Sequence, residues 1–153
     1  MEDRFKNSSA VMLMLMRKSE TGEEILLQKR KNTGYCDGFY DFSAVGHVEA
    51  NESMKMAIIR EAKEELNIDI DINNIDFVTI IHKFDNGRIY YNGYFKVMEW
   101  KGEPIIKEPD KNEELKWISI NSVNNVINVI NDREQALRNY KNNIKYSEFG
   151  WVY

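Results

Sequence analysis

Apolar residues recur along this chain in short runs that are typical of β-strands. Runs of this length, bounded by Gly, Asn, Asp or Ser, favour strands over helices. The predicted strands are Ala10–Arg17, Glu24–Arg30, Ile75–Phe84, Arg88–Trp100 and Leu115–Ile120, and Phe39–Val45 leads toward the first helix. Asp85-Asn86-Gly87 is a good hairpin turn between two of these strands.

Two segments have the apolar spacing of an α-helix. One is Asn131–Asn142, and the other ends at Leu66. Asn51 or Ser53 can cap the start of the earlier helix, which would place Glu52 favourably in the first turn. Asn67 follows Leu66, and Asn tolerates the left-handed conformation that is common just past a helix.

Three glutamates gather on one side of the earlier helix. At about 100° per residue from Arg60, Glu64 lies at roughly 40°, Glu61 at roughly 100° and Glu65 at roughly 140°. This acidic arc (Glu61, Glu64 and Glu65) borders the apolar side of the helix. Glu61 and Glu65 form a like-charge pair of the kind that destabilises a helix by about 0.2–0.5 kcal/mol. A hard cation with oxygen ligands would reverse that effect, so the arc serves either solvent or a divalent cation.

The arc belongs to a longer pattern of fixed spacings. Gly46, Glu52 and Arg60 precede it, and the segment resembles the signature of the Nudix hydrolase family, G-x5-E-x7-R-E-U-x-E-E-x-G-U, where U is a bulky apolar residue. Asn67 stands where the signature has its second Gly, which is a mild conformational change. Ala62 is a small version of the first U, and Ile68 matches the last.

This resemblance implies a fold, a metal and a set of roles. The fold would be α/β, a Nudix-type α/β/α sandwich around a mixed β-sheet, with residues 1–153 forming a single Nudix hydrolase domain. Glu61, Glu64 and Glu65, together with the Gly46 carbonyl, would bind Mg²⁺, for which Mn²⁺ can substitute. Arg60 would pair with a signature glutamate and fix its orientation.

Two weaker matches extend the resemblance beyond the signature. Trp100–Glu108 resembles the W-x-G-E-P-x-x-K-E loop of the 8-oxo-dGTP pyrophosphatases in this family, which makes Glu108 a candidate metal ligand or base. Either Glu64 or Glu108 would then take the proton of the attacking water. Ile25–Arg30 resembles the family's second strand, whose final Arg meets substrate phosphate, so Arg30 is the candidate substrate-binding residue. Three nearby acids could substitute for Glu108: Asp110, Glu113 and Glu114.

Other residues are candidates for contacting the substrate. Strand residues that could stack a base are Tyr90, Tyr91, Tyr94 and Phe95, although successive residues face opposite ways and at least half should only pack. Asparagines that sit where relatives sometimes read the base edge are Asn124, Asn125 and Asn128. His47 adjoins the signature. Cys36 lies in Gly-Tyr-Cys-Asp-Gly, which does not resemble the catalytic motif of isopentenyl diphosphate isomerases.

Composition limits the partners. The chain has 153 residues and a formal charge of −4, and no Lys/Arg run suggests a nucleic-acid groove. The single cysteine, Cys36, permits no internal disulfide and favours a reducing, cytoplasmic location. The apolar run Val11–Met16 is far shorter than the ~20 residues that span a bilayer. We therefore expect a small nucleotide substrate, no nucleic acid, no membrane contact, and a monomer or homodimer.

The expected activity is hydrolysis of a phosphoanhydride bond in a nucleoside diphosphate linked to another group. The favoured substrate is a (deoxy)nucleoside triphosphate, which would give a monophosphate and pyrophosphate, because of the resemblance of Trp100–Glu108 to the pyrophosphatase loop. One alternative is ADP-ribose or another nucleotide sugar. The other is a Nudix module that binds a nucleotide without cleaving it, against which the intact acidic arc argues.

Overall fold

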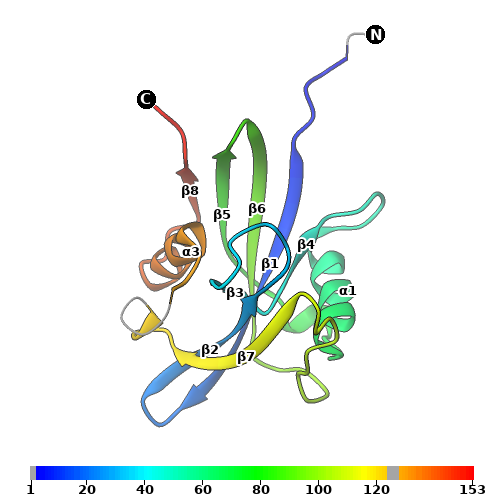
Figure 1. The fold of residues 1–153 in the computed structure, drawn as a ribbon, viewed down its shortest axis with the longest axis vertical. Helices are drawn as coiled ribbons and strands as arrows, with labels where there is room; N and C mark the ends of the chain where they lie inside the picture. Colours follow the sequence, from blue (N-terminus) through cyan, green and yellow to red (C-terminus); the bar gives the residue numbers. More distant parts are fainter. Residues whose placement is uncertain (1–2, 124–127) are drawn as a thin grey trace.

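The computed structural model describes residues 3–123 and 128–153. Within these residues eight strands form one mixed sheet with the order β3-β2-β1-β6-β5-β8, in which β4 pairs with β1 and β7 pairs with β2 (Figure 1). The strands are β1 Ser8–Ser19, β2 Gly22–Arg30, β3 Tyr40–Phe42, β4 Ala44–His47, β5 Asp76–Asp85, β6 Arg88–Val97, β7 Asn112–Ser119 and β8 Tyr146–Phe149.

Strand β1 organises the sheet because it has three partners. It runs parallel to β6, its first half pairs with β4, and its second half pairs with β2. The run Val11–Met16 is buried throughout, as expected for a strand covered on both faces. Alternate residues of this run enter two different cores, with Met12 in one and Leu13 in the other.

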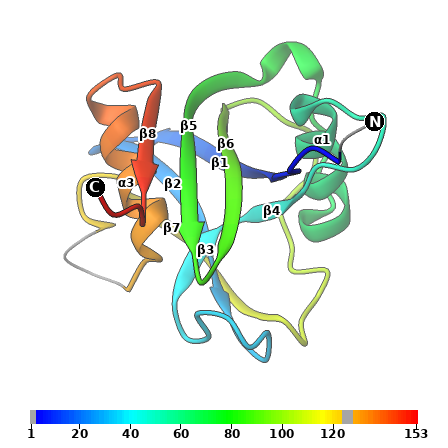
Figure 2. The same cartoon turned by 90° about the horizontal axis from the view of Figure 1, so that it is seen from above.

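One helix covers each of these cores. Helix α1, Met54–Leu66, packs on the face that carries Leu13, and helix α3, Asn131–Lys141, packs on the face that carries Met12. Figure 2 shows the sheet running between the two helices. The predicted α/β/α sandwich around a mixed sheet is therefore confirmed. No helix in the described ranges is long and apolar enough to cross a membrane.

The predicted strand boundaries are close, with local corrections. The strand predicted as Arg88–Trp100 ends at Val97, and the one predicted as Leu115–Ile120 begins at Asn112 and ends at Ser119. The hairpin turn is confirmed: Asn86 and Gly87 both have positive φ, as a two-residue type I′ turn requires. Strand β8 was not predicted; it lies parallel to β5 at the sheet edge.

The cap of α1 is Ser53, whose hydroxyl accepts from the Met56 amide. The expectation that Glu52 lies in the first turn is therefore wrong, because Glu52 precedes the cap. Its carboxylate instead accepts from the guanidinium of Arg60. Asn67 takes the left-handed conformation expected of it, with φ 56°.

Helix α3 is held to the sheet by buried charges as well as by apolar packing. Arg133 donates from Nε to Asp41 Oδ1 at 2.6 Å and from Nη1 to Asp132 Oδ2 at 2.6 Å. All three side chains are buried. Burial opposes the ionisation of Asp132, but the positive charges of Arg133 and Lys83 hold its pKa below the ordinary value. The network thus joins α3 to β3 and β5.

Removing one member of this network should destabilise the fold. Arg133→Met leaves the Asp41 and Asp132 carboxylates buried without their main partner, so we expect the free energy of unfolding in urea to fall by about 3–5 kcal/mol. Arg138→Met is the matched control: Arg138 lies exposed on the same helix, and the change should stay within about 0.5 kcal/mol. Equal losses in the two variants would contradict the role of the network.

Candidate active site

The acidic arc lies on α1 where the helix meets β4. Gly46 on β4 faces the Glu61 carboxylate so closely that a Cβ at Gly46 would lie 2.1 Å from Glu61 Oε1. No residue with a side chain fits there while Glu61 keeps its position. This close approach gives the signature Gly a steric reason, and it brings the β4 backbone against the carboxylates.

Arg60 ties the glutamates of the signature together. Its Nη2 donates to Glu52 Oε1 at 2.7 Å, and its Nη1 donates to Glu61 Oε1 at 2.7 Å. A weaker bond of 3.3 Å reaches Glu64, and Nη2 also donates to the His47 carbonyl at 3.0 Å. Arg60 therefore connects the segment before α1, the acidic arc and the end of β4.

Glu61 and Glu65 are the two carboxylates of the arc whose pKa values are raised. Glu65 is largely buried, and Val45 N donates to its Oε2 at 2.9 Å. Burial and the nearby charge of Glu61 raise the pKa of Glu65 to about 9. Burial also raises the pKa of Glu61, against the opposing effect of Arg60. Two half-buried carboxylates whose negative charges oppose each other in this way are chemically suited to a hard cation.

The donor set therefore fits a divalent metal, although its ligands are not gathered in advance. Within residues 3–123 and 128–153, no three His, Cys, Asp or Glu side chains are already arranged to hold a metal ion. The guanidinium of Arg60 lies among the carboxylates instead. Metal binding by Glu61 and Glu64 would require their carboxylates to exchange the contacts with Arg60 for contacts with the cation.

The loop that carries Glu108 is attached to the end of α1. Ile105 N donates to the Leu66 carbonyl and Lys107 N donates to the Glu65 carbonyl, which satisfies two of the last carbonyls of the helix. The charge of Glu108 is one of the causes that raise the pKa of Glu65. Glu108 also lies 3.8 Å from Lys111. Glu113, five residues further along the chain, forms an ion pair with Lys29 on β2 instead.

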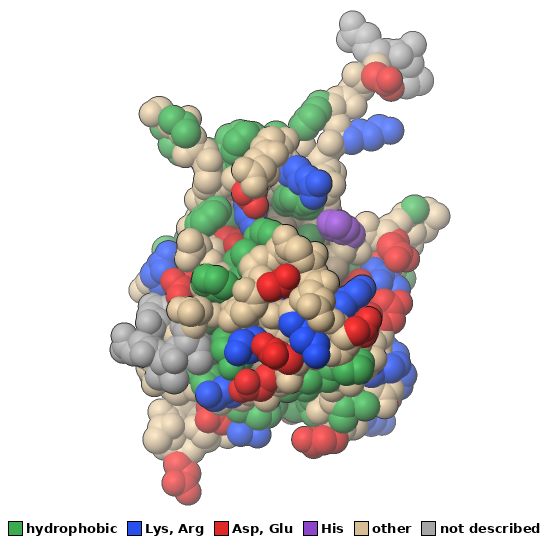
Figure 3. All heavy atoms as spheres, in the orientation of Figure 1, with side chains coloured by type: hydrophobic (Ala, Val, Ile, Leu, Met, Phe, Trp, Pro, Cys, Tyr) green, Lys and Arg blue, Asp and Glu red, His purple; other side chains and the backbone are tan. Residues whose placement is uncertain are grey.

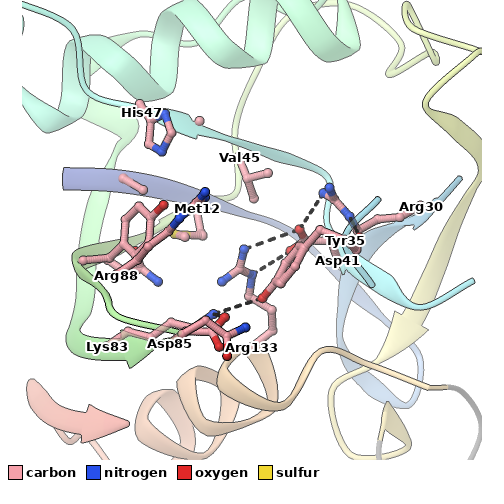
Figure 4. A pocket seen from close by; sticks show the side chains of 15 residues that line it. Met12, Arg30, Tyr35, Asp41, Val45, His47, Lys83, Asp85, Arg88 and Arg133 are labelled. Atoms are coloured by element: carbon pink, nitrogen blue, oxygen red, sulfur yellow. Dashed lines mark hydrogen bonds and ion pairs between the residues drawn. The ribbon is translucent and has the colours of Figure 1, made fainter. Parts of the chain in front are cut away.

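A cavity of about 570 Å³ lies on the other side of β4 from the acidic arc (Figure 4). Val45, Gly46 and His47 form the shared wall. The charged side chains that line the cavity are Arg30, Asp41, Lys83, Asp85, Arg88 and Arg133. The cavity and the acidic arc are therefore neighbours that share β4.

Arg30 lies at the cavity wall, at the end of β2. Its Nη1 approaches Asp41 Oδ2 at 3.4 Å, and its Nε donates to the Tyr35 carbonyl at 2.8 Å. Tyr35 reaches across the cavity rim, where its hydroxyl accepts from Lys83 Nζ at 3.0 Å. Figure 4 shows Tyr35 and Asp41 on one side and His47 and Arg88 on the other.

Several cavity residues were not singled out from the sequence. Asp41, Lys83 and Arg133 come from separate elements and meet only in the folded chain. The sequence carried one signal for two of the cavity residues, because Lys83 and Asn92 are polar residues within predicted strands. The structure buries both side chains.

The aromatic and asparagine candidates divide between the cavity and other places. Tyr90 lines the cavity and stacks on His47, with ring centroids 5.9 Å apart. Tyr91 faces the opposite way and stacks on His82, while Tyr94 and Phe95 are buried in the cores. Asn124 and Asn125 lie outside the described residues. The Asn128 carbonyl accepts from Tyr40 N.

The family model of the NUDIX domain matches residues 6–140. The chain therefore belongs to the Nudix family, and it is a Nudix hydrolase, of the type that cleaves phosphoanhydride bonds. Hydrolases of this family generally use divalent metals.

Individual relatives agree with this assignment. The chain is 32% identical over 79 residues to an 8-oxo-dGTP diphosphatase of Proteus vulgaris. The matched stretch covers 52% of this chain and 68% of that protein. The structure resembles the MutT NUDIX hydrolase from Burkholderia pseudomallei with a TM-score of 0.76 at 23% identity, covering 88% of this chain and 98% of that one. It also resembles the NUDIX domain of Shewanella oneidensis NrtR complexed with ADP ribose, with a TM-score of 0.73 at 14% identity, covering 93% and 91%. At these identities the structural likenesses show the fold alone.

The contact between Gly46 and Glu61 can be tested directly. Gly46→Ala places a methyl group against the Glu61 carboxylate, and we expect the free energy of unfolding to fall by about 1–3 kcal/mol. In a Glu61→Ala background the obstructing carboxylate is gone, so the same substitution should cost much less. A double-mutant cycle by urea denaturation measures this difference. Additive losses would show that the two residues do not touch.

Proposed function

We propose that this chain hydrolyses a phosphoanhydride bond in a nucleoside diphosphate linked to another group, in a reaction that requires Mg²⁺ or Mn²⁺. The leading substrate is a (deoxy)nucleoside triphosphate, with a nucleoside monophosphate and pyrophosphate as products. The observation that carries this proposal is the pair of half-buried glutamates, Glu61 and Glu65, on the other side of β4 from a cavity large enough for a nucleoside.

The resemblance to the Nudix signature supports a role for each of these residues. The metal would be held by Glu61, Glu64, Glu65 and the Gly46 carbonyl. Arg60 orients Glu61 through the hydrogen bond from its Nη1. The bound cation supplies charge neutralisation for the diphosphate and lowers the pKa of a bound water. Arg30 is the candidate contact for a substrate phosphate at the cavity wall.

The bond changes are those of a simple hydrolysis. The water oxygen forms a bond to one phosphorus, and the bond from that phosphorus to the bridging oxygen breaks. The leaving phosphate takes the electron pair. The proton of the water goes to a carboxylate at the edge of the arc, either Glu64 or Glu108.

Two observations bear on the choice of substrate. The resemblance of Trp100–Glu108 to the loop of 8-oxo-dGTP pyrophosphatases, together with the relative of that activity, supports a nucleoside triphosphate. A related Nudix domain was solved with ADP ribose, and this supports ADP-ribose or another nucleotide sugar as the second candidate.

A nucleotide panel with a metal control tests the proposal. Phosphate release from nucleoside triphosphates and nucleotide sugars, coupled to pyrophosphatase or phosphatase, should require Mg²⁺ or Mn²⁺ and vanish in excess EDTA. Glu65→Gln should remain folded, because the Gln oxygen can still accept from Val45 N, and should lose at least about 100-fold in kcat. Turnover that persists in EDTA, or a Glu65→Gln enzyme close to wild type, would refute the metal mechanism.

The role of Glu108 needs its own comparison. If Glu108 acts as the base, Glu108→Gln should lower kcat with little change in KM, the pattern of an interaction made in the transition state. Glu113→Gln is the matched control, since Glu113 pairs with Lys29 on β2 and should leave kcat near wild type. If Glu113→Gln loses activity while Glu108→Gln stays normal, the loop match has identified the wrong carboxylate. In that case the nucleotide sugars would become the leading substrates.

A further inference from the structure

The charged groups deep in the cavity already have partners within the protein. Asp41 accepts from Arg133 and from its neighbour Phe42 N, and Arg133 also donates to Asp132. Lys83 lies 3.4 Å from Asp132 and bonds to the Tyr35 hydroxyl. Because these charges compensate one another, the cavity floor offers little net attraction for a further anion.

Asn92 is the exception among the buried polar side chains that line the cavity. It lies on β6, between Tyr90 and Tyr94 on the same sheet face, and is 2% exposed. Its Oδ1 is buried and has no hydrogen-bond partner. Of the four buried side-chain atoms without a partner in the described residues, Asn92 Oδ1 is the one whose residue lines the cavity. A buried amide oxygen that lacks a partner is suited to accept from a ligand.

The walls around Asn92 suit a flat ligand. Tyr35 lies on one side of the cavity, held in place by Lys83 through its hydroxyl and by Arg30 through its backbone. The stacked rings of Tyr90 and His47, with an interplanar angle of 1°, form another part of the lining. Aromatic side chains in the lining, together with one buried amide that lacks a partner, are suited to a planar ring with polar edges.

We infer that Asn92 is a specificity-determining residue, which accepts an N–H group of the substrate's nucleobase through Oδ1 and donates to the adjacent acceptor of the base through Nδ2. This rests on the proposed function, because it concerns the nucleoside part of that substrate. A side-chain amide presents one acceptor and one donor together, so it matches a ring edge on which an N–H lies beside a carbonyl or ring nitrogen. A substrate without such an edge leaves the amide buried and unpaired.

Kinetics of three variants test this role. For Asn92→Leu, kcat/KM of the preferred nucleoside triphosphate should fall at least about 10-fold, mostly through KM, and the differences between bases should shrink. Asn92→Asp presents two acceptors, so its preference should move toward guanine, whose edge carries two adjacent N–H donors. Asn73→Leu changes an exposed asparagine that is not part of the cavity lining and should leave base preference unchanged.

Binding without metal separates this inference from the hydrolase proposal. Titration of AMP, GMP, CMP and UMP into the protein in EDTA should show the same ranking of bases for the wild type, and Asn92→Leu should flatten it. Equal affinities for the four monophosphates in the wild type, or an unchanged ranking in a folded Asn92→Leu protein, would overturn the role of Asn92. A wild type that ranks the bases but hydrolyses no nucleotide in Mg²⁺ would sink the proposed function alone.

Discussion

The contact of the Gly46 backbone with the Glu61 carboxylate is the constraint on which the site depends. Since no side chain separates them, α1 can approach β4 closely enough for Val45 N to reach Glu65. The same strand presents its other side to the cavity. Strand β4 therefore separates the acidic arc from the cavity, and its residues Val45, Gly46 and His47 border both.

Charged side chains are paired on the α3 face of the sheet, whereas like charges lie together on the α1 face. On the α3 face, Arg133, Asp132, Asp41 and Lys83 compensate one another, so the network stabilises the fold and shapes the cavity (Figure 4). On the α1 face, Glu61 and Glu65 repel each other, and Arg60 relieves only part of this repulsion. Figure 3 shows acidic and basic side chains mixed over the visible surface. The carboxylates on the α1 face are thus less well compensated than those of the network on the α3 face.

The sequence predicted the parts of this protein that are encoded locally. The spacing from Gly46 to Glu65 lies within one strand, one loop and one helix, so periodicity alone placed the three glutamates together. The Asn86-Gly87 turn and the left-handed Asn67 were predicted for the same reason. The cavity could not be predicted, because Asp41 and Arg133 meet only through tertiary packing. Strand β8 was missed because its pairing with β5 joins residues far apart in the sequence. Glu52 was misplaced because two residues, Asn51 and Ser53, could have capped the helix, and the structure uses Ser53.

The link between Asp41 and Arg133 joins residues 92 positions apart, and β1 pairs in parallel with β6 over a similar separation. Long loops must close before such contacts form, and their closure is slow. The acidic arc and the cavity thus differ in the range of contacts that they need: the arc lies within one short segment, whereas the cavity closes only when residues far apart in the sequence have met. Loss of such long-range contacts would affect the cavity before it affected the helix that carries the arc.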